Sequence, residues 1–167
     1  VLECPDHPCS AMNRGFLSWM LGSLPDGFVV GCARLGPVGL WGKAPGTNGP
    51  IAGVILYIVA FHGHPVAAQI LIGVLLALFA VAICGEAERR LMQRDPGEII
   101  LDEVVAQPLV FIGLPASIGG TIWAPILLLT GFALFRLFDI WKPLGIRRLQ
   151  HLPGGQGVVA DDLAAAI

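Results

Sequence analysis

The sequence predicts an all-α, multi-pass integral membrane protein, a helical bundle with about four spans and an acidic site that faces the cytoplasm. The chain is 55% hydrophobic and 13% charged, whereas soluble domains average about 45–50% and about 25%. Its mean hydropathy is +0.76, and its apolar residues gather in long runs. The net charge of −2 excludes the strongly basic balance of nucleic-acid-binding proteins, so no nucleic-acid partner is expected.

The chain is predicted to divide into an N-terminal extension and a membrane domain. Residues 1–27 are expected to be irregular or to lie at the membrane interface, and residues 28–167 to form the domain. Residues 28–40 are apolar but too short and too often interrupted to span. Residues 42–49 are rich in turn formers, and Pro50 suits the first position of a helix, where its missing N–H is not needed.

Four apolar segments follow this loop, at residues 51–61, 66–84, 99–114 and 121–138. A helix needs about 20 residues to cross a bilayer. Only the second segment meets that length alone, so the others are expected to use flanking residues or to tilt. Pro108 and Pro125 are predicted to kink the third and fourth segments, which membrane helices tolerate.

The basic residues predict the orientation of these segments. The two short hairpins, residues 62–65 and 115–120, carry no Lys, Arg, Asp or Glu. Because basic segments stay in the cytoplasm, the connection between the second and third spans and both chain ends are placed there, and the two hairpins are placed outside. The basic residues concerned are Arg34, Lys43, Arg89, Arg90, Arg94, Lys142, Arg147 and Arg148.

Two acidic residues, Asp102 and Glu103, stand where the third apolar segment begins. Charged side chains at membrane depth are costly and are rarely placed there without a metal, a cation or another partner. They therefore indicate a functional site near the cytoplasmic membrane surface.

A second charged group lies at the end of the fourth segment. Arg136, Asp139 and Lys142 recur at intervals of three, which places them on one side of a helix. They either form a surface ion network or contribute to the same site as Asp102 and Glu103.

A third acidic group, Asp161 and Asp162, follows the turn-rich residues 153–157. Such a pair commonly marks the N-terminus of a helix, where the helix dipole favours negative charge, and residues 163–167 are predicted to begin one. The predicted topology also places the pair in the same compartment as the other acidic residues, so it remains a candidate for the site.

Together these groups indicate a Mg2+-dependent enzyme that acts on a phosphorylated lipid or another membrane-borne substrate. Mg2+ prefers oxygen ligands and keeps waters or substrate phosphate in its shell, and Arg binds phosphate bidentately. The predicted metal ligands are Asp102, Glu103, Asp139 and Asp161. The candidate catalytic residues are Asp102, Glu103, Asp139 and Asp162, and the candidate phosphate-binding residues are Lys43, Thr47, Arg136 and Lys142.

Four blocks of sequence, in order, resemble the phosphatidylglycerophosphatase A family. The blocks are Ala44-Pro-Gly-Thr-Asn-Gly49, Ile99-Ile-Leu-Asp-Glu-Val-Val-Ala-Gln107, Phe135-Arg-Leu-Phe-Asp-Ile-Trp-Lys-Pro143 and Gly154-Gly-Gln-Gly-Val-Val-Ala-Asp-Asp162. The resemblance covers the chain from about Arg34 to its end. It implies a Mg2+-dependent, multi-pass enzyme of the bacterial inner membrane that hydrolyses phosphatidylglycerophosphate to phosphatidylglycerol and phosphate.

The chain departs from the family pattern at several positions. Asn48 and Pro50 replace an aromatic residue and a serine, Ala106 replaces a glycine, Leu144-Gly145 replaces Trp-Pro, and Ala165-Ala166 replaces Ala-Gly. None of these changes removes a carboxylate or the Arg136/Lys142 pair. They bear on local packing and substrate fit.

Two other classes of protein fit the composition. A small transporter would carry ionisable residues through the middle of the membrane, whereas here they gather at one side. A membrane scaffold would use its acidic and basic residues only to pair with one another.

Overall fold

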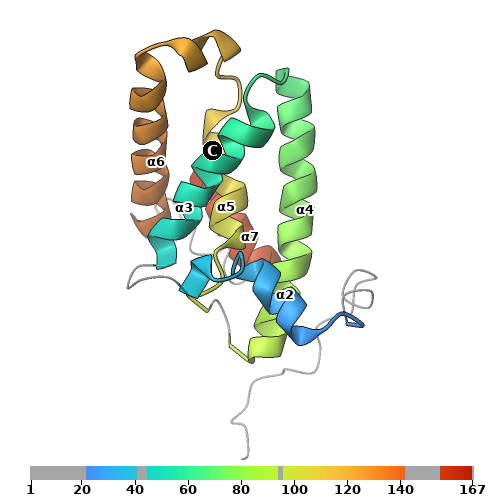
Figure 1. Ribbon diagram of the computed structural model, residues 1–167. Coiled ribbons are helices and arrows are strands. Elements are labelled where there is room, and N and C mark those ends of the chain that lie inside the picture. The colour runs from blue at the N-terminus through green and yellow to red at the C-terminus, as the bar shows by residue number, and fades with distance from the viewer. Residues whose placement is uncertain (1–21, 41–44, 94–95, 142–154, 167) are drawn as a thin grey trace, which may run out of the picture.

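The computed structural model describes residues 22–40, 45–93, 96–141 and 155–166, and every regular element within them is helical (Figure 1). The predicted all-α class is confirmed. The α-helices are α2 (Asp26–Ala33), α3 (Pro45–Leu56), α4 (Val66–Leu91), α5 (Leu101–Ala106), α6 (Trp123–Trp141) and α7 (Gly155–Ala166). Shorter helical turns are the 3-10 segments η1 (Val38–Leu40), η3 (Gln107–Phe111) and η4 (Ala116–Gly120) and the π-helical η2 (Tyr57–Phe61).

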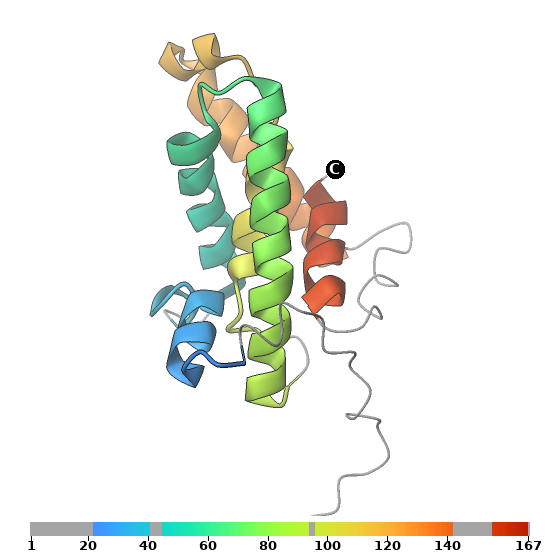
Figure 2. The ribbon, with the colours of Figure 1, turned by 90° about the vertical axis from the view of Figure 1, so that its right-hand side faces the viewer.

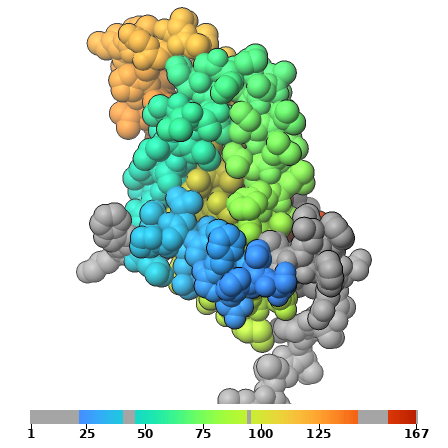
Figure 3. Space-filling view, turned by 45° about the vertical axis from the view of Figure 1, so that its right-hand side comes forward, coloured from blue at the N-terminus to red at the C-terminus, as the bar shows by residue number. Residues whose placement is uncertain are grey.

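The short helix α5 lies at the centre of the molecule. It packs against α3, α4 and α7, and in Figure 3 its yellow-green atoms show in the seam between α3 and α4. Its Val105 joins a core with Cys84 of α4 and Val159 of α7. Figure 2 shows α7 beside the lower half of α4. The acidic segment 102–103 is therefore enclosed by helices that are distant in the sequence.

Two helices, α4 and α6, are long and apolar enough to cross a membrane. They have 26 and 19 residues, and their most apolar 18-residue windows have mean hydropathies of 2.7 and 1.6. At 1.5 Å per residue they measure about 39 and about 28 Å, against a hydrocarbon core of about 30 Å. Their outer faces expose large apolar side chains, a surface that suits lipid. These side chains include Leu71, Val74, Leu75 and Leu78 of α4 and Leu129 and Leu137 of α6.

The other two predicted spans are shorter. Residues 46–61 form one apolar helix of intermediate length. The third apolar segment changes from α-helix to 3-10 helix at Gln107, one residue before Pro108, and regular structure stops at Ile112. Proline removes one α-helical hydrogen bond and crowds the preceding turn, so the predicted kink takes the form of a change in helix type.

Two predicted helix starts are wrong. Pro50 lies inside α3, which begins at Pro45, and a membrane environment tolerates an internal proline of this kind. The residues predicted as a turn before the Asp161–Asp162 pair instead open α7 at Gly155. The pair therefore lies in the middle of a helix, where both side chains are buried, and does not cap its N-terminus.

Gly155 lies where α7 comes close to the backbone of α4. A Cβ at this position would overlap the carbonyl oxygen of Val81 and lie 2.6 Å from the backbone nitrogen of Gly85. The glycine therefore serves the close approach of α7 to α4, as small residues commonly do between membrane helices.

The predicted cytoplasmic markers Arg34, Arg89 and Arg90 are paired with acidic residues. Arg89 and Arg90 hold the buried carboxylate of Glu86 at N–O distances of 2.5 and 2.9 Å, and Arg34 pairs with Glu98. Arg90 also reaches Asp26 at 2.9 Å and so links α4 to α2. The Arg34–Glu98 pair links the end of α2 to the segment before α5.

We predict that Gly155→Ala lowers the unfolding temperature of the detergent-solubilised protein, because the new methyl group meets the backbone of α4. Overpacking of this kind costs about 1–3 kcal/mol. The matched control is Gly31→Ala in α2, where a Cβ has nothing within 4 Å and where helix propensity favours alanine. Equal unfolding temperatures for the two variants would contradict the close α4–α7 contact.

Candidate functional site

Arg136 of α6 joins two of the predicted acidic residues. Its Nη1 donates hydrogen bonds to Oε1 of Glu103 at 3.1 Å and to Oδ2 of Asp139 at 2.7 Å. The three side chains are 21%, 14% and 11% exposed, in that order. Asp139 lies one helical turn from Arg136, as the spacing of three predicted, and Glu103 comes from α5. The network therefore ties α6 to the central helix.

The first turns of α3 close one side of this network through glycines. A Cβ on Gly46 would lie 3.3 Å from Nη2 of Arg136 and 3.4 Å from Oε1 of Glu103. A Cβ on Gly49 would overlap Oε2 of Glu103 and lie 2.9 Å from its Cβ. Any larger side chain at these positions would push α3 away from the charged groups. The N-terminus of α3 thus meets the Arg136 network directly.

Asp102 and the α7 pair Asp161 and Asp162 are more deeply buried than the Arg136 network. Asp102 is 5% exposed and its carboxylate accepts a hydrogen bond from the backbone N–H of Glu103 at 2.9 Å. Asp161 and Asp162 are 2% and 4% exposed. Asp102 and Asp162 both lie near the buried Cys84 of α4. The predicted acidic residues are therefore carried by three helices, α5, α6 and α7.

The predicted site residues are thus distributed over four helices. Glu103, Arg136 and Asp139 are in direct contact, and Asp102 is adjacent to Glu103 in the chain. Thr47 is exposed in the first turn of α3. Lys43 and Lys142 lie outside the described residues.

The donor set suits a hard divalent cation, although the described residues do not assemble a group of three or more Asp, Glu, His or Cys in metal-binding range. Oε2 of Glu103 is buried and accepts no hydrogen bond within the described part of the chain, and Asp161 is 2% exposed. Buried oxygens of this kind need a partner. Since Mg2+ typically binds one or two carboxylates together with substrate phosphate, these acids fit it.

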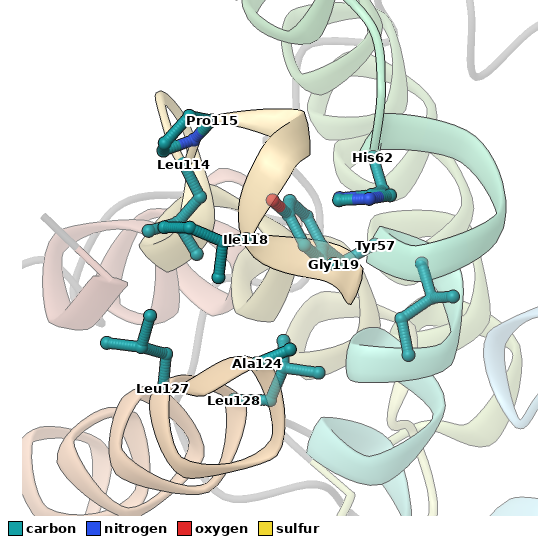
Figure 4. A pocket seen from close by; sticks show the side chains of 10 residues that line it. Tyr57, His62, Leu114, Pro115, Ile118, Gly119, Ala124, Leu127 and Leu128 are labelled. Carbon is teal, nitrogen blue, oxygen red and sulfur yellow. The ribbon is translucent and has the colours of Figure 1, made fainter. Parts of the chain in front are cut away.

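A cavity among the described residues lies away from this site. It has a volume of about 170 Å³ and is formed by η2, η4 and the first turns of α6 (Figure 4). Its walls are mainly aliphatic, with Tyr57 and His62 as polar members. Arg136 follows the last lining residue, Leu128, by eight positions, or about 12 Å along α6. This cavity is therefore separate from the acidic cluster (Asp102, Glu103, Asp139, Asp161 and Asp162).

The glycines at positions 46, 49 and 53 are functional features that the sequence reasoning missed. Residues 42–49 were predicted as a loop, so their contact with Glu103 could not be foreseen. The signal was the spacing itself, because intervals of three and four place all three glycines on one face of a helix.

The phosphatidylglycerophosphatase A family model matches residues 31–167. The chain belongs to this family. The match includes the whole of α3–α7, and with it every described residue of the Arg136 network.

Named relatives agree on lipid phosphatases. A phosphatidylglycerophosphatase A of Haemophilus influenzae is 38% identical over 130 residues, which are 77% of this chain and 76% of that protein. A phosphatidylglycerophosphatase A of Escherichia coli is 29% identical over 167 residues, or 98% and 87%. A Bacteroides thetaiotaomicron protein, named provisionally as a phosphatidylinositol-3-phosphatase, is 33% identical over 127 residues, or 74% and 77%. No solved structure matches the chain significantly.

We predict that Gly49→Ala strongly lowers phosphatase activity while the protein still folds. The added methyl group displaces the Glu103 carboxylate from its position beside Arg136, since both its Oε2 and its Cβ lie in the way. Phosphate release and the unfolding temperature of the purified variant measure the two effects. Gly97→Ala is the control, because a Cβ there has nothing within 4 Å; an equally active Gly49→Ala would contradict the geometry.

Proposed function

We propose that this protein hydrolyses the terminal phosphomonoester of phosphatidylglycerophosphate, releasing phosphatidylglycerol and phosphate, for phospholipid synthesis. The observation that carries the proposal is the meeting of Arg136, Glu103 and Asp139 against the glycine face of α3. Membership of the phosphatidylglycerophosphatase A family supports the same reaction. The two relatives named for this activity support the substrate.

The substrate phosphate is proposed to lie at the N-terminus of α3. The first N–H groups of a helix have no partner within the helix and attract anions. Nη2 of Arg136 faces Gly46 in this turn, and Thr47 stands exposed beside it. Lys43 and Lys142, close in sequence to this turn and to Asp139, are proposed to supply further positive charge. The acyl chains would remain in the surrounding lipid.

The acidic residues are proposed to hold Mg2+ and to prepare the attacking water. Asp102, Glu103, Asp139 and Asp161 are the proposed ligands, and Asp102, Glu103, Asp139 and Asp162 the candidates for acid–base work. Bound Mg2+ would neutralise phosphate charge and lower the pKa of a coordinated water. Arg136 orients the phosphate, and Glu103, which keeps Oε2 without a hydrogen-bond donor among the described residues, is placed to accept a proton from water.

The proposed topology has four crossings in the cell inner membrane, formed within a domain of residues 28–167. The segments α3–η2, α4, α5–η3 and α6 run alternately up and down in Figure 1, with α3–η2 and α5–η3 covering only part of the length of α4. Positive-inside orientation then places the acidic cluster on the cytoplasmic side. The two shorter segments would cross with help from their neighbours, since α5 is sheathed by α3, α4 and α7.

A second candidate substrate comes from the Bacteroides relative, whose name refers to a phosphatidylinositol 3-phosphate. Both lipids present a phosphomonoester on a polar head group, so the Arg136 network suits either phosphate. The head groups differ in bulk, because glycerol is smaller than inositol. Side-by-side assays of the two lipids with the purified protein will show which has the higher kcat/KM, and we expect it to be phosphatidylglycerophosphate.

We predict that Asp102→Asn and Asp139→Asn each reduce Mg2+-dependent phosphate release at least about 100-fold, the usual scale for loss of a catalytic carboxylate. Chelation of Mg2+ should abolish the activity of the unmodified protein and readdition restore it. Asp26→Asn is the control, because this exposed residue makes a surface ion pair far along the chain from the site.

Each competing function has its own result in these assays. Full activity in either acidic variant would remove the assigned role of that residue. No phosphate release from any phosphorylated lipid, with or without Mg2+, would favour a scaffold whose charges only pair. Movement of a solute across proteoliposomes without hydrolysis would favour a transporter.

A further inference from the structure

Gln107 is the most deeply buried polar side chain near the acidic cluster. It is 0% exposed, and neither its amide nitrogen nor its amide oxygen has a hydrogen-bond partner among the described residues. An unpaired buried amide is costly. Such a group therefore calls for a missing partner, commonly an ordered water or a ligand.

Glu103 of α5 and Gln107, the first residue of η3, share one face of the continuous helical segment α5–η3. They are four residues apart, so their Cβ atoms are neighbours on the helix. Gly53 of α3 packs on Gln107, where a Cβ would lie 2.5 Å from the glutamine Cβ, and Gly49 packs on Glu103 in the same way. Two orphaned polar groups, Oε2 of Glu103 and the Gln107 amide, thus lie one helical turn apart along the same glycine-lined seam.

A second buried glutamine shows what a purely structural amide does in this fold. Gln69 of α4 is 2% exposed. Its Nε2 donates to the carbonyl oxygen of His64 at 2.9 Å, and its Oε1 accepts from the backbone N–H of Gly113 at 3.1 Å. Gln69 therefore joins the 62–65 hairpin to the segment just before the 115–120 hairpin. Among the described residues, neither polar atom of the Gln107 amide makes a corresponding contact.

We propose that Gln107 positions the water that attacks the substrate phosphate, an inference that rests on the proposed hydrolysis. The amide nitrogen donates to a water oxygen and the amide oxygen accepts from a neighbouring water, since glutamine offers both groups. The attacking water accepts from the amide nitrogen and donates one hydrogen to Oε2 of Glu103. Buried waters typically make about three hydrogen bonds to groups left unsatisfied by the protein. This arrangement satisfies both orphaned groups at once.

The test compares Gln107→Leu with Gln69→Leu in the full-length, detergent-solubilised protein. For Gln107→Leu we expect an unfolding temperature equal to or above that of the unmodified protein, because two buried polar atoms without a protein partner among the described residues leave the core. The kcat of this variant should fall about 10–100-fold, the usual scale for residues that orient a reacting group through a hydrogen bond. Its KM for phosphatidylglycerophosphate should change little. For Gln69→Leu we expect the opposite pattern, a lower unfolding temperature and an unchanged kcat for the folded protein.

Two outcomes overturn the inference. One is a Gln107→Leu variant that loses stability as Gln69→Leu does, and the other is one that keeps the full kcat. Gln107→Met, which keeps the length and lacks the branch of leucine, replaces Gln107→Leu if that variant does not fold, with the same expectations. If the unmodified protein itself releases no phosphate, the proposed function fails instead, and the stability comparison still decides whether the amide is unpaired.

Discussion

The close approach of α3 to α5 is the constraint on which the rest of the site depends. Glycines at positions 46, 49 and 53 leave space that Arg136, Glu103 and Gln107 fill. In lipid, helices gain little from apolar contact with one another, and small residues let backbones approach so that packing and polar contacts hold them. A larger residue at any of these positions would separate the helices and open the carboxylate of Glu103 to its surroundings. The same contact therefore both holds the fold and shapes the site.

The shortness of α5 follows from the same arrangement. Residues 101–111 change helix type at Gln107 and stop soon after Pro108, so α5 cannot serve as an independent membrane helix. It is stable because α3, α4 and α7 surround it, and its apolar residues Leu101, Val104 and Val105 are buried among them. A charged segment inside an apolar bundle is tolerated only with partners. Arg136 supplies one partner from α6, because its Nη1 donates to both Glu103 and Asp139.

The sequence was sufficient for features that depend on local pattern. Val66 as the start of the long apolar helix, the position of α6, and the contact of Arg136 with Asp139 all follow from run length and a spacing of three. The expected topology placed Glu103 and Arg136 at the same membrane face but did not predict their contact. The glycine face of α3, the early start of α7 at Gly155 and the different fates of Gln69 and Gln107 could not be predicted. Each of these features depends on a contact with a segment that is distant in the sequence, and local composition does not indicate which segment that is.

The charges around Arg136 constrain how a phosphate can enter. Asp102, Glu103 and Asp139 act on one another electrostatically, and within the described residues the cation in direct contact with Glu103 and Asp139 is Arg136. A phosphomonoester brings close to two further negative charges. In a medium less polar than water, like charges repel strongly, so the site favours phosphate only when additional positive charge is present. A divalent cation held by the acids, with lysines 43 and 142 nearby in the chain, would reverse that balance. Under the proposed function, the excess of acid would serve to hold that cation, and the same cation would both admit the substrate and activate the water beside Glu103.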